Sequence, residues 1–287
     1  MDAILRDLRY GFRSLVKHPG VSLFAITALT LGIGVTATMF SIVYGALIRG
    51  LPYENADRIL EVKRAMVSKR MDRMDMPLGE YFEYRDQQHS FSLMAASTDG
   101  TMNVAGGTGL PERYLGAWVT ASFFDIMKVH PLFGRTFTAG EDSPRGAKVV
   151  VIGYGLWDRR FGRSADALGQ TLRVNGQPFT VIGVLPQGYR LPNNCDLWLP
   201  LQEDPLAKKH DAQVQVTPIG VLAPGVSLAR ADAESGEIAK QMETKFKEFD
   251  EGISANAMTF VRAEIGPEPF QLLYAISSTR KTAKSIA

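Results

Sequence analysis

The sequence predicts an α+β fold preceded by one N-terminal transmembrane helix. Three observations carry this prediction. Residues 19–48 contain no charged side chain, the later residues form short apolar runs separated by Gly and Pro, and strand patterns mix with helical patterns without strict alternation. A helix needs about 20 apolar residues to cross the hydrocarbon layer of a membrane. Irregular mixing of strands and helices is typical of the α+β class.

The composition is that of an ordinary globular protein. The chain has 287 residues, of which 45% are hydrophobic and 22% charged, with a net charge of +2. Its basic residues are spread along the chain, whereas nucleic-acid binders gather them on one face, so no nucleic-acid partner is expected. Cys195 is the only cysteine, which excludes an intrachain disulfide and a cysteine-based metal site.

Residues 1–18 have the pattern of a short amphipathic helix. Apolar side chains recur there at helical spacing, and Arg6, Arg9, Arg13 and Lys17 lie between them. Such a helix lies at a membrane surface with its cations toward the lipid headgroups. The alternative is a solvated first turn that leads into the membrane helix.

We expect residues 19–48 to form the membrane anchor, in contact with the lipid bilayer. A buried core helix is one alternative, but such helices seldom have so long an uncharged run. A cleaved signal peptide is the other, but its apolar region has about 7–15 residues and ends at a cleavage site, which this sequence lacks. Basic residues flank the segment on both sides, so the charge bias does not orient it.

One face of this helix carries small residues. Ala25, Ala28, Gly32 and Thr36 follow one another at spacings of three or four residues. Small side chains let a second membrane helix approach closely, so these four residues form a predicted helix-packing face. Because glycine is common in membrane helices, a chance occurrence is the alternative.

Residues 49–265 are predicted to form the soluble domain. We expect residues 66–76 to be a solvated loop and Ser122 to cap a short helix that ends at Met127. Strands are expected at residues 59–63, 91–97, 113–120, 148–153, 171–174, 178–184, 214–222 and 256–261. Helices are expected at residues 77–88, 154–161 and 227–249.

The pair Asn175-Gly176 is the clearest local signal. It joins two alternating strands, and Asn-Gly tolerates the positive φ angles of a type I′ turn. The sequence therefore predicts a two-residue hairpin.

The sequence predicts no catalytic, cofactor-binding or metal-binding residues. Residues 106–109 (Gly-Gly-Thr-Gly) lack the lysine of a phosphate-binding loop, and no zinc or nucleophile motif occurs. The histidines His18, His89, His130 and His210 are scattered singly, and Cys195 has no basic neighbour to activate it. An active site assembled from residues far apart in sequence is the alternative.

Dense matches in order over residues 1–260 identify a resemblance to a known family. They include His18-Pro19-Gly20, Leu29-Thr30-Leu31-Gly32-Ile33-Gly34, Leu51-Pro52-Tyr53, Val119-Thr120-Ala121-Ser122-Phe123-Phe124, Leu156-Trp157-Asp158-Arg159-Arg160-Phe161-Gly162 and Asp196-Leu197-Trp198-Leu199-Pro200-Leu201. The sequence resembles MacB-type, FtsX-like ABC transporter permeases, and within them the duplicated permeases common in Acidobacteria.

The resemblance implies an architecture and a set of partners. The N-terminus would be cytoplasmic, one helix would cross the bacterial inner membrane, and residues 49–265 would be a MacB-like periplasmic core domain. The implied partners are an ABC ATPase subunit, a periplasmic adaptor protein and other permease chains in a dimer. ATP hydrolysis would belong to the ATPase, so no enzyme activity and no cofactor are expected of this chain.

Residues 266–287 depart from the family pattern. The family continues into a second membrane helix, whereas this segment has a seven-residue apolar stretch followed by basic residues. The expectation is therefore a truncated or frameshifted permease that contributes its extracytoplasmic domain to ATP-driven efflux or export. The alternatives are a membrane-anchored binding or adaptor module without transport activity and, less favoured, an anchored periplasmic enzyme.

Overall fold

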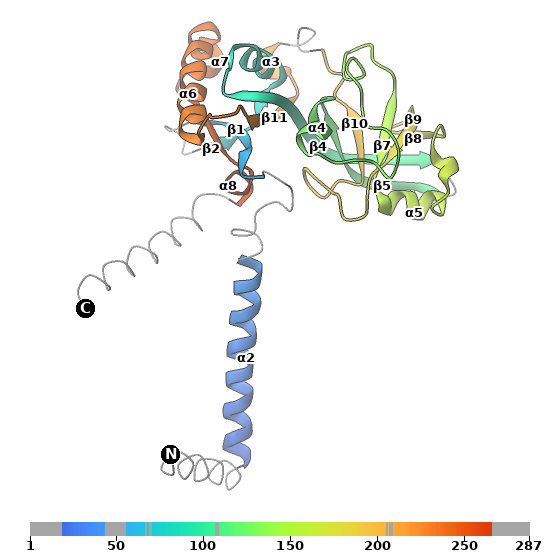
Figure 1. The fold of residues 1–287 in the computed structure, drawn as a ribbon, viewed down its shortest axis with the longest axis vertical. Helices are drawn as coiled ribbons and strands as arrows, with labels where there is room; N and C mark the ends of the chain where they lie inside the picture. Colours follow the sequence, from blue (N-terminus) through green and yellow to red (C-terminus); the bar gives the residue numbers. More distant parts are fainter. Residues whose placement is uncertain are drawn as a thin grey trace, which may run out of the picture. The chain divides into compact units, whose positions relative to one another are not determined.

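The computed structural model describes residues 19–43, 56–66, 68, 71–106, 109–204, 206 and 209–265. The predicted amphipathic helix (1–18), the end of the predicted anchor (44–48) and the tail (266–287) lie outside the described residues. The chain divides into two compact units, Met1–Pro52 and Tyr53–Ala287, and each is described by itself (Figure 1).

In the first unit, helix α2 (Pro19–Val43) has 25 residues and carries no charged side chain. Its large apolar side chains are exposed, among them Leu23, Phe24 and Ile33. No helix within the described residues is both long enough and apolar enough to cross a membrane.

The threonine hydroxyl groups of α2 form hydrogen bonds within the helix. Four of them donate a hydrogen bond to the carbonyl oxygen four residues earlier, at 2.7–2.8 Å: Thr27, Thr30, Thr36 and Thr38. A hydroxyl that is bonded in this way does not need water. The described side chains of the helix therefore present a largely apolar surface despite its threonine content.

The second unit is built on a sheet of 12 strands. In chain order they are β1 (Ile59–Met66), β2 (Met71–Met74), β3 (Met76–Pro77), β4 (Phe91–Gly106), β5 (Gly109–Val119), β6 (Phe133–Gly134), β7 (Val149–Ile152), β8 (Thr171–Val174), β9 (Gln177–Val184), β10 (Leu197–Pro200), β11 (Gln215–Leu222) and β12 (Ile253–Thr259). The helices are α3 (Leu78–Gln87), α4 (Phe123–Ile126), α5 (Tyr154–Phe161), α6 (Leu228–Lys245), α7 (Lys247–Asp250) and α8 (Phe260–Ile265), with short 3-10 turns η2 (Ala56–Arg58), η4 (Ala165–Ala167) and η5 (His210–Ala212). The predicted α+β class is confirmed.

The sheet runs in the order β12-β1-β11-β4-β5-β10-β7-β9-β6, with β2 beside β1, β3 beside β11, and β8 beside β4 and β9. Two of its pairs, β5–β10 and β7–β9, are parallel. Strand β4 has 16 residues and changes partner along its length. Its first half pairs with β11, its second half pairs with β5, and Ser97 pairs with both.

The domain has two hydrophobic cores, one on each side of the point where β4 changes partner. The α6 lobe comprises β1, β2, β3, β11 and β12 with α3, α6 and α7, and its core includes Leu60, Tyr81 and Ile238. The α5 lobe comprises β5 to β10 with α5, and its core includes Val150 and Leu172. Figure 1 shows α3, α6 and α7 grouped with β1 and β11, and α5 with β8 and β9. Strand β4 belongs to both lobes and joins them.

The prediction of a solvated loop at residues 66–76 is partly wrong, because this segment contains β2 and the first residue of β3. β2 is largely exposed, as expected, but it pairs with β1. Met76 is buried where β3 pairs with β11. The partner strand lies about 140 residues later in the chain, so no local pattern could reveal this pairing.

Two helix predictions need correction. Ser122 precedes α4 as expected but forms no side-chain cap, because its hydroxyl donates to the carbonyl oxygen of Met94 at 2.7 Å. The helix expected at 227–249 begins at Leu228, where the Ser227 side chain caps it by accepting from the amide of Arg230. It then breaks at Phe246, so that α7 forms a separate turn.

The predicted hairpin is confirmed. Strands β8 and β9 are joined by Asn175 and Gly176, whose φ angles of 50° and 83° are both positive. The turn also docks on β4, because the amide of Asn103 donates to Asn175 Oδ1 at 2.9 Å.

We expect Gly176→Val to lower the free energy of unfolding by about 1 kcal/mol or more, since a β-branched residue is strained at positive φ. A Cβ at this position would meet no atom within 4 Å, so the cost comes from the backbone alone. Thermal unfolding measures it. Gly176→Asn is the control, because asparagine adopts this conformation readily. Equal melting temperatures for the Val and Asn variants would contradict the assignment.

Candidate functional site in the cleft between the lobes

The predicted helix-packing face lies on α2. Ala25, Ala28, Gly32 and Thr36 are all exposed, and Thr36 bonds to the carbonyl oxygen of Gly32. A Cβ built on Gly32 would meet nothing within 4 Å. The described residues thus leave room for a helix against this face, and its packing role stays a prediction.

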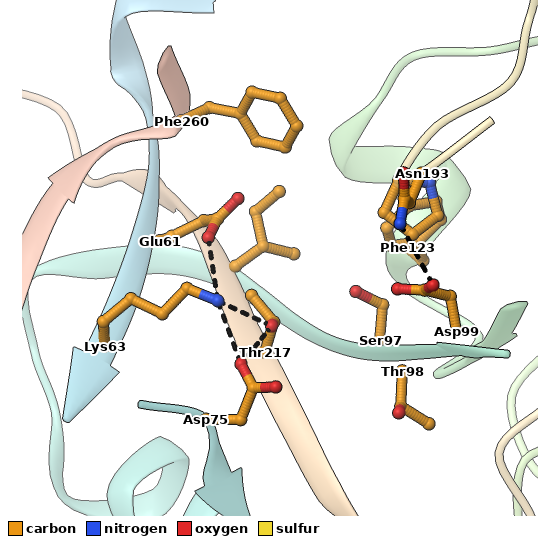
Figure 2. Close-up of a pocket in the computed structure, with 12 residues that line it drawn as sticks. Glu61, Lys63, Asp75, Ser97, Thr98, Asp99, Phe123, Asn193, Thr217 and Phe260 are labelled. Atoms are coloured by element: carbon orange, nitrogen blue, oxygen red, sulfur yellow. Dashed lines mark hydrogen bonds and ion pairs between the residues drawn. The ribbon is translucent and has the colours of Figure 1, made fainter. Parts of the chain in front are cut away.

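The second unit contains a polar cavity of about 210 Å³ where the two lobes meet. Figure 2 shows its two walls. The α6 lobe contributes Glu61, Lys63, Asp75, Thr217 and Ile219, and α8 contributes Phe260. The opposite wall consists of Ser97, Thr98 and Asp99 from β4, Phe123 from α4, and Pro192 and Asn193 from the loop before β10.

Lys63 is the centre of the first wall. Its Nζ donates to Asp75 Oδ1 and Thr217 Oγ1, both at 2.9 Å, and lies 3.4 Å from Glu61 Oε2. Thr217 in turn donates to Asp75 Oδ1 at 2.7 Å. Burial lowers the pKa of Lys63, but attraction to Glu61 and Asp75 outweighs it, so that the pKa is raised overall. The side chain is therefore a fixed ammonium ion that ties β1, β11 and the β2–β3 connection together.

The opposite wall carries a second polar contact. Asn193 donates through Nδ2 to Asp99 Oδ2 at 3.2 Å, and this contact links the loop before β10 to β4 (Figure 2). The lining thus holds three carboxylates against one ammonium ion. A protonated lysine cannot act as a nucleophile or a general base. The carboxylates that surround it accept hydrogen bonds, so the cleft is suited to binding hydrogen-bond donors.

This cleft could not be predicted from the sequence. Its polar residues come from β1, β4, β11 and two connections, and each looks like ordinary surface charge in its own segment. Glu61 and Lys63 alternate with Leu60 and Val62, which in the sequence indicates a half-exposed strand, and only the structure shows that the strand is buried on both faces. Charged residues in a buried strand indicate a polar interior.

The structure describes Cys195 and three of the four histidines, and one of these residues departs from the expected state. Cys195 is buried, and burial raises the pKa of its thiol to about 12, in keeping with an inert side chain. His89 and His130 are exposed, and His18 lies outside the described residues. His210 departs from the expected solvated state, because its side chain is 10% exposed and lies beside two carboxylates.

A sequence model of the MacB-like periplasmic core domain matches residues 22–238. The chain belongs to this family. The match begins inside α2 and ends inside α6, and it includes both walls of the cleft except Phe260. The resemblance to MacB-type permeases is confirmed.

Relatives of the MacB-like core domain agree with this assignment. The "Probable export ATP-binding/permease protein MacB" of Pseudomonas entomophila (strain L48) is 33% identical over 87 residues, which are 29% of this chain and 13% of that protein. The aligned part therefore spans only a small fraction of that relative's length.

Two solved structures share the fold of the MacB-like core domain. The periplasmic region of MacB from Actinobacillus actinomycetemcomitans has a TM-score of 0.53 and 15% identity, over 71% of this chain and 90% of that one. The extracellular domain of the noncanonic ABC-type transporter YknZ from Gram-positive bacteria has a TM-score of 0.51 and 16% identity, over 70% of this chain and 99% of that one. At these identities the likeness establishes the fold alone.

Proposed function

We propose that this chain is a permease subunit of a MacB-type ABC transporter. It contributes the extracytoplasmic domain that couples to ATP-driven efflux or export. The observation that carries the proposal is the family match, which runs without interruption from α2 into the sheet domain. In this arrangement the N-terminus is cytoplasmic, α2 is part of an inner-membrane anchor, and the second unit lies in the periplasm.

The surface of α2 supports the anchoring role. Its threonine hydroxyls are bonded within the helix, and its apolar side chains are exposed. Backbone and side-chain polar groups in lipid must be satisfied internally. The face formed by Ala25, Ala28, Gly32 and Thr36 then packs against a partner helix, from a second permease chain or elsewhere in the transporter.

The sheet supports the coupling role. Strand β4 has 16 residues, so at roughly 3.3 Å per residue it extends for about 50 Å. It is hydrogen-bonded to β11 in one lobe and to β5 in the other. A displacement applied to the α6 lobe therefore moves the α5 lobe through a continuous hydrogen-bonded element. ATP hydrolysis itself is assigned to a separate ATPase subunit, and a periplasmic adaptor is the further partner.

The test is whether ATPase activity purifies with the tagged chain from solubilised membranes of its native host. We expect vanadate-sensitive ATP hydrolysis with the wild type, and none with the recombinant chain alone. Gly32→Leu should reduce the co-purified activity roughly tenfold, because it fills the small-residue face; a helix contact of about 1.4 kcal/mol corresponds to that factor.

Gly34→Leu is the matched control. Gly34 lies on the opposite face of α2, and a Cβ at either glycine meets nothing within 4 Å, so both variants fit the chain equally well. Equal loss in both variants would contradict the packing face. Absence of ATPase activity from all preparations, with an adaptor still bound, would favour the membrane-anchored adaptor module instead.

A further inference from the structure

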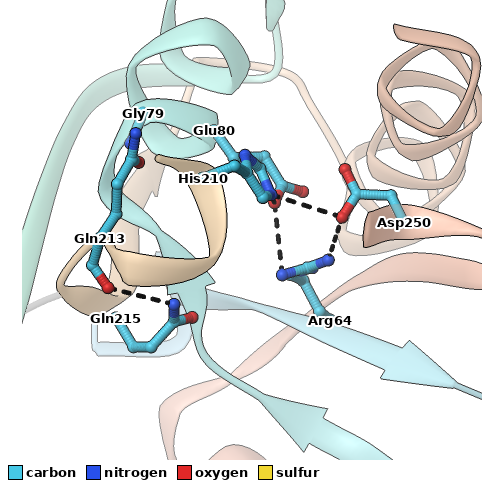
Figure 3. A network of polar contacts seen from close by, with 7 residues as sticks. All are labelled: Arg64, Gly79, Glu80, His210, Gln213, Gln215 and Asp250. Atoms are coloured by element: carbon cyan, nitrogen blue, oxygen red, sulfur yellow. Dashed lines mark hydrogen bonds and ion pairs between the residues drawn. The ribbon is translucent and has the colours of Figure 1, made fainter. Parts of the chain in front are cut away.

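Four charged or ionisable side chains from distant segments meet inside the α6 lobe. They are Arg64 of β1, Glu80 of α3, His210 of η5 and Asp250 of α7 (Figure 3). Their side chains are 6%, 5%, 10% and 2% exposed, respectively. No motif in the sequence predicts metal ligands at these positions.

Each of the four residues has a buried atom without a hydrogen-bond partner among the described residues; in Arg64 it is the donor Nε, and in the other three it is an atom that could bind a metal ion. These three atoms are Glu80 Oε2, His210 Nε2 and Asp250 Oδ2. A buried polar atom without a hydrogen bond is costly, and its presence in a native fold calls for an explanation. The three residues also lie together, since one possible ligand atom from each lies within 4.8 Å of the others.

The distances match those between ligands of one ion. His210 Nε2 lies 3.9 Å from Glu80 Oε2 and 3.6 Å from Asp250 Oδ1, the second oxygen of the carboxylate whose Oδ2 is unpartnered. Both distances are too long for hydrogen bonds. Ligand atoms about 2.0–2.2 Å from a tetrahedral ion stand roughly 3.4 Å apart, so a small inward shift would let all three residues share one ion.

The charge of the cluster favours a cation. Two carboxylates face one guanidinium, which leaves one negative charge in excess, and a buried charge without a counter-ion is costly. Arg64 alone therefore does not neutralise the site.

Arg64 is placed to support a metal ligand and not to replace the metal. Its Nη2 bonds to Asp250 Oδ1, and Asp250 Oδ2 remains for coordination. Its approach to Glu80 Oε2, at 3.4 Å, is longer than a hydrogen bond. A group that holds one oxygen of a ligating carboxylate orients the other, as partners outside the ligand set do in metal sites.

The imidazole is also held in place. The ring of His210 stacks on Phe246 at 4.8 Å between centroids and lies 5.3 Å from Phe249. The break between α6 and α7 occurs at Phe246, and Asp250 follows within the next turn. The helix break at Phe246 therefore places both the aromatic ring that stacks on His210 and the carboxylate of Asp250.

We propose that Glu80, His210 and Asp250 form a binding site for one divalent transition-metal ion of the Zn²⁺ class, with Arg64 as the positioning residue for Asp250. The donor set of one imidazole and two carboxylates suits zinc, whereas calcium takes six to eight oxygen ligands and magnesium a near-ideal octahedron of oxygens. A bound ion would fasten η5 and α7 to α3. Zinc would therefore hold together three segments that are distant in sequence.

The test uses the full chain, purified in detergent through a tag without histidines, stripped with a chelator and then given Zn²⁺. We expect one zinc per chain by elemental analysis and a higher melting temperature with Zn²⁺ than with Mg²⁺. His210→Gln and Asp250→Asn should each weaken zinc binding at least 100-fold. His89→Gln is the control, because His89 is an exposed histidine paired with Glu234, and it should bind zinc as the wild type does.

Cobalt provides a readout that does not depend on the variants. Co²⁺ added to the stripped wild-type chain should give the visible absorption of a tetrahedral site, and Zn²⁺ should displace it. A wild-type chain that binds no zinc and develops no such absorption would overturn the proposal. So would zinc binding that is unchanged in both His210→Gln and Asp250→Asn.

Discussion

Replacing Arg160 by methionine is expected to lower the free energy of unfolding by about 3–5 kcal/mol. Arg160 lies on α5 and is 2% exposed. Its guanidinium donates to three carbonyl oxygens, those of Gly106 at 2.8 Å, Val104 at 3.1 Å and Leu110 at 2.6 Å. These carbonyls lie where the β4–β5 ladder becomes irregular.

The size of the effect follows from what the substitution leaves behind. Methionine fills much of the same volume but donates no hydrogen bond, so three carbonyl oxygens lose a charged donor. Each buried acceptor left without a partner costs about 1–3 kcal/mol. At roughly 2–4 °C per kcal/mol for a domain of this size, the melting temperature should fall by roughly 6–20 °C.

Arg159→Met is the matched control for Arg160→Met. Arg159 is the preceding residue on the same helix, but its side chain is 53% exposed and its nearest carboxylate, that of Asp196, is 3.9 Å away. We expect a change of less than about 1 kcal/mol, as for exposed ion pairs in general. Similar melting temperatures for the two variants would show that the carbonyl contacts of Arg160 do not stabilise the domain.

Replacing Trp198 by alanine is the second substitution with a large expected effect, about 3–5 kcal/mol. Trp198 lies on β10 and is fully buried between β5 and β7. Its ring packs against Tyr189, with centroids 5.6 Å apart, and against Phe124 at 6.2 Å. Alanine would leave a cavity that these rigid aromatic neighbours cannot fill.

Trp198 also positions one wall of the cleft. Its Nε1 donates to the carbonyl oxygen of Leu191 at 2.7 Å, and the next two residues, Pro192 and Asn193, line the cavity. Trp198→Phe separates the two roles, because it keeps most of the packing and removes the donor. We expect it to cost about 1–3 kcal/mol, less than the alanine variant.

Thermal unfolding followed by the fluorescence of Trp118 and Trp157 measures both Trp198 variants. If Trp198→Phe is as unstable as Trp198→Ala, the hydrogen bond to Leu191 outweighs the packing, which would contradict the cavity argument. If neither variant is destabilised, β10 does not occupy the centre of the sheet.

Features set by neighbouring residues could be predicted from the sequence. The helix at 154–161 has the observed bounds, and its C-cap Gly162 adopts the left-handed conformation. The Asn175-Gly176 turn follows from the positive φ angles that this pair tolerates. The helical form of the uncharged N-terminal segment follows from its composition, and the family from motifs in fixed order.

Features set by sheet order could not be predicted in this way. Strand β3 pairs with β11, and β1 pairs with both β11 and β12, across most of the length of the domain. Because of these pairings, the charged residues Glu61, Lys63 and Arg64 are buried. The same residues in an edge strand would be exposed to solvent.

The sequence by itself determined the fold class and the local turns, because these depend on periodicity and on the conformational preferences of adjacent residues, and it determined the family through motifs in a fixed order. Only the tertiary structure decided the two polar sites. Lys63 meets Thr217, and Glu80 meets His210 and Asp250, across more than 100 residues of chain. The free energy that brings such groups together is the burial of the apolar core around them, and it leaves no pattern in the segments that carry them.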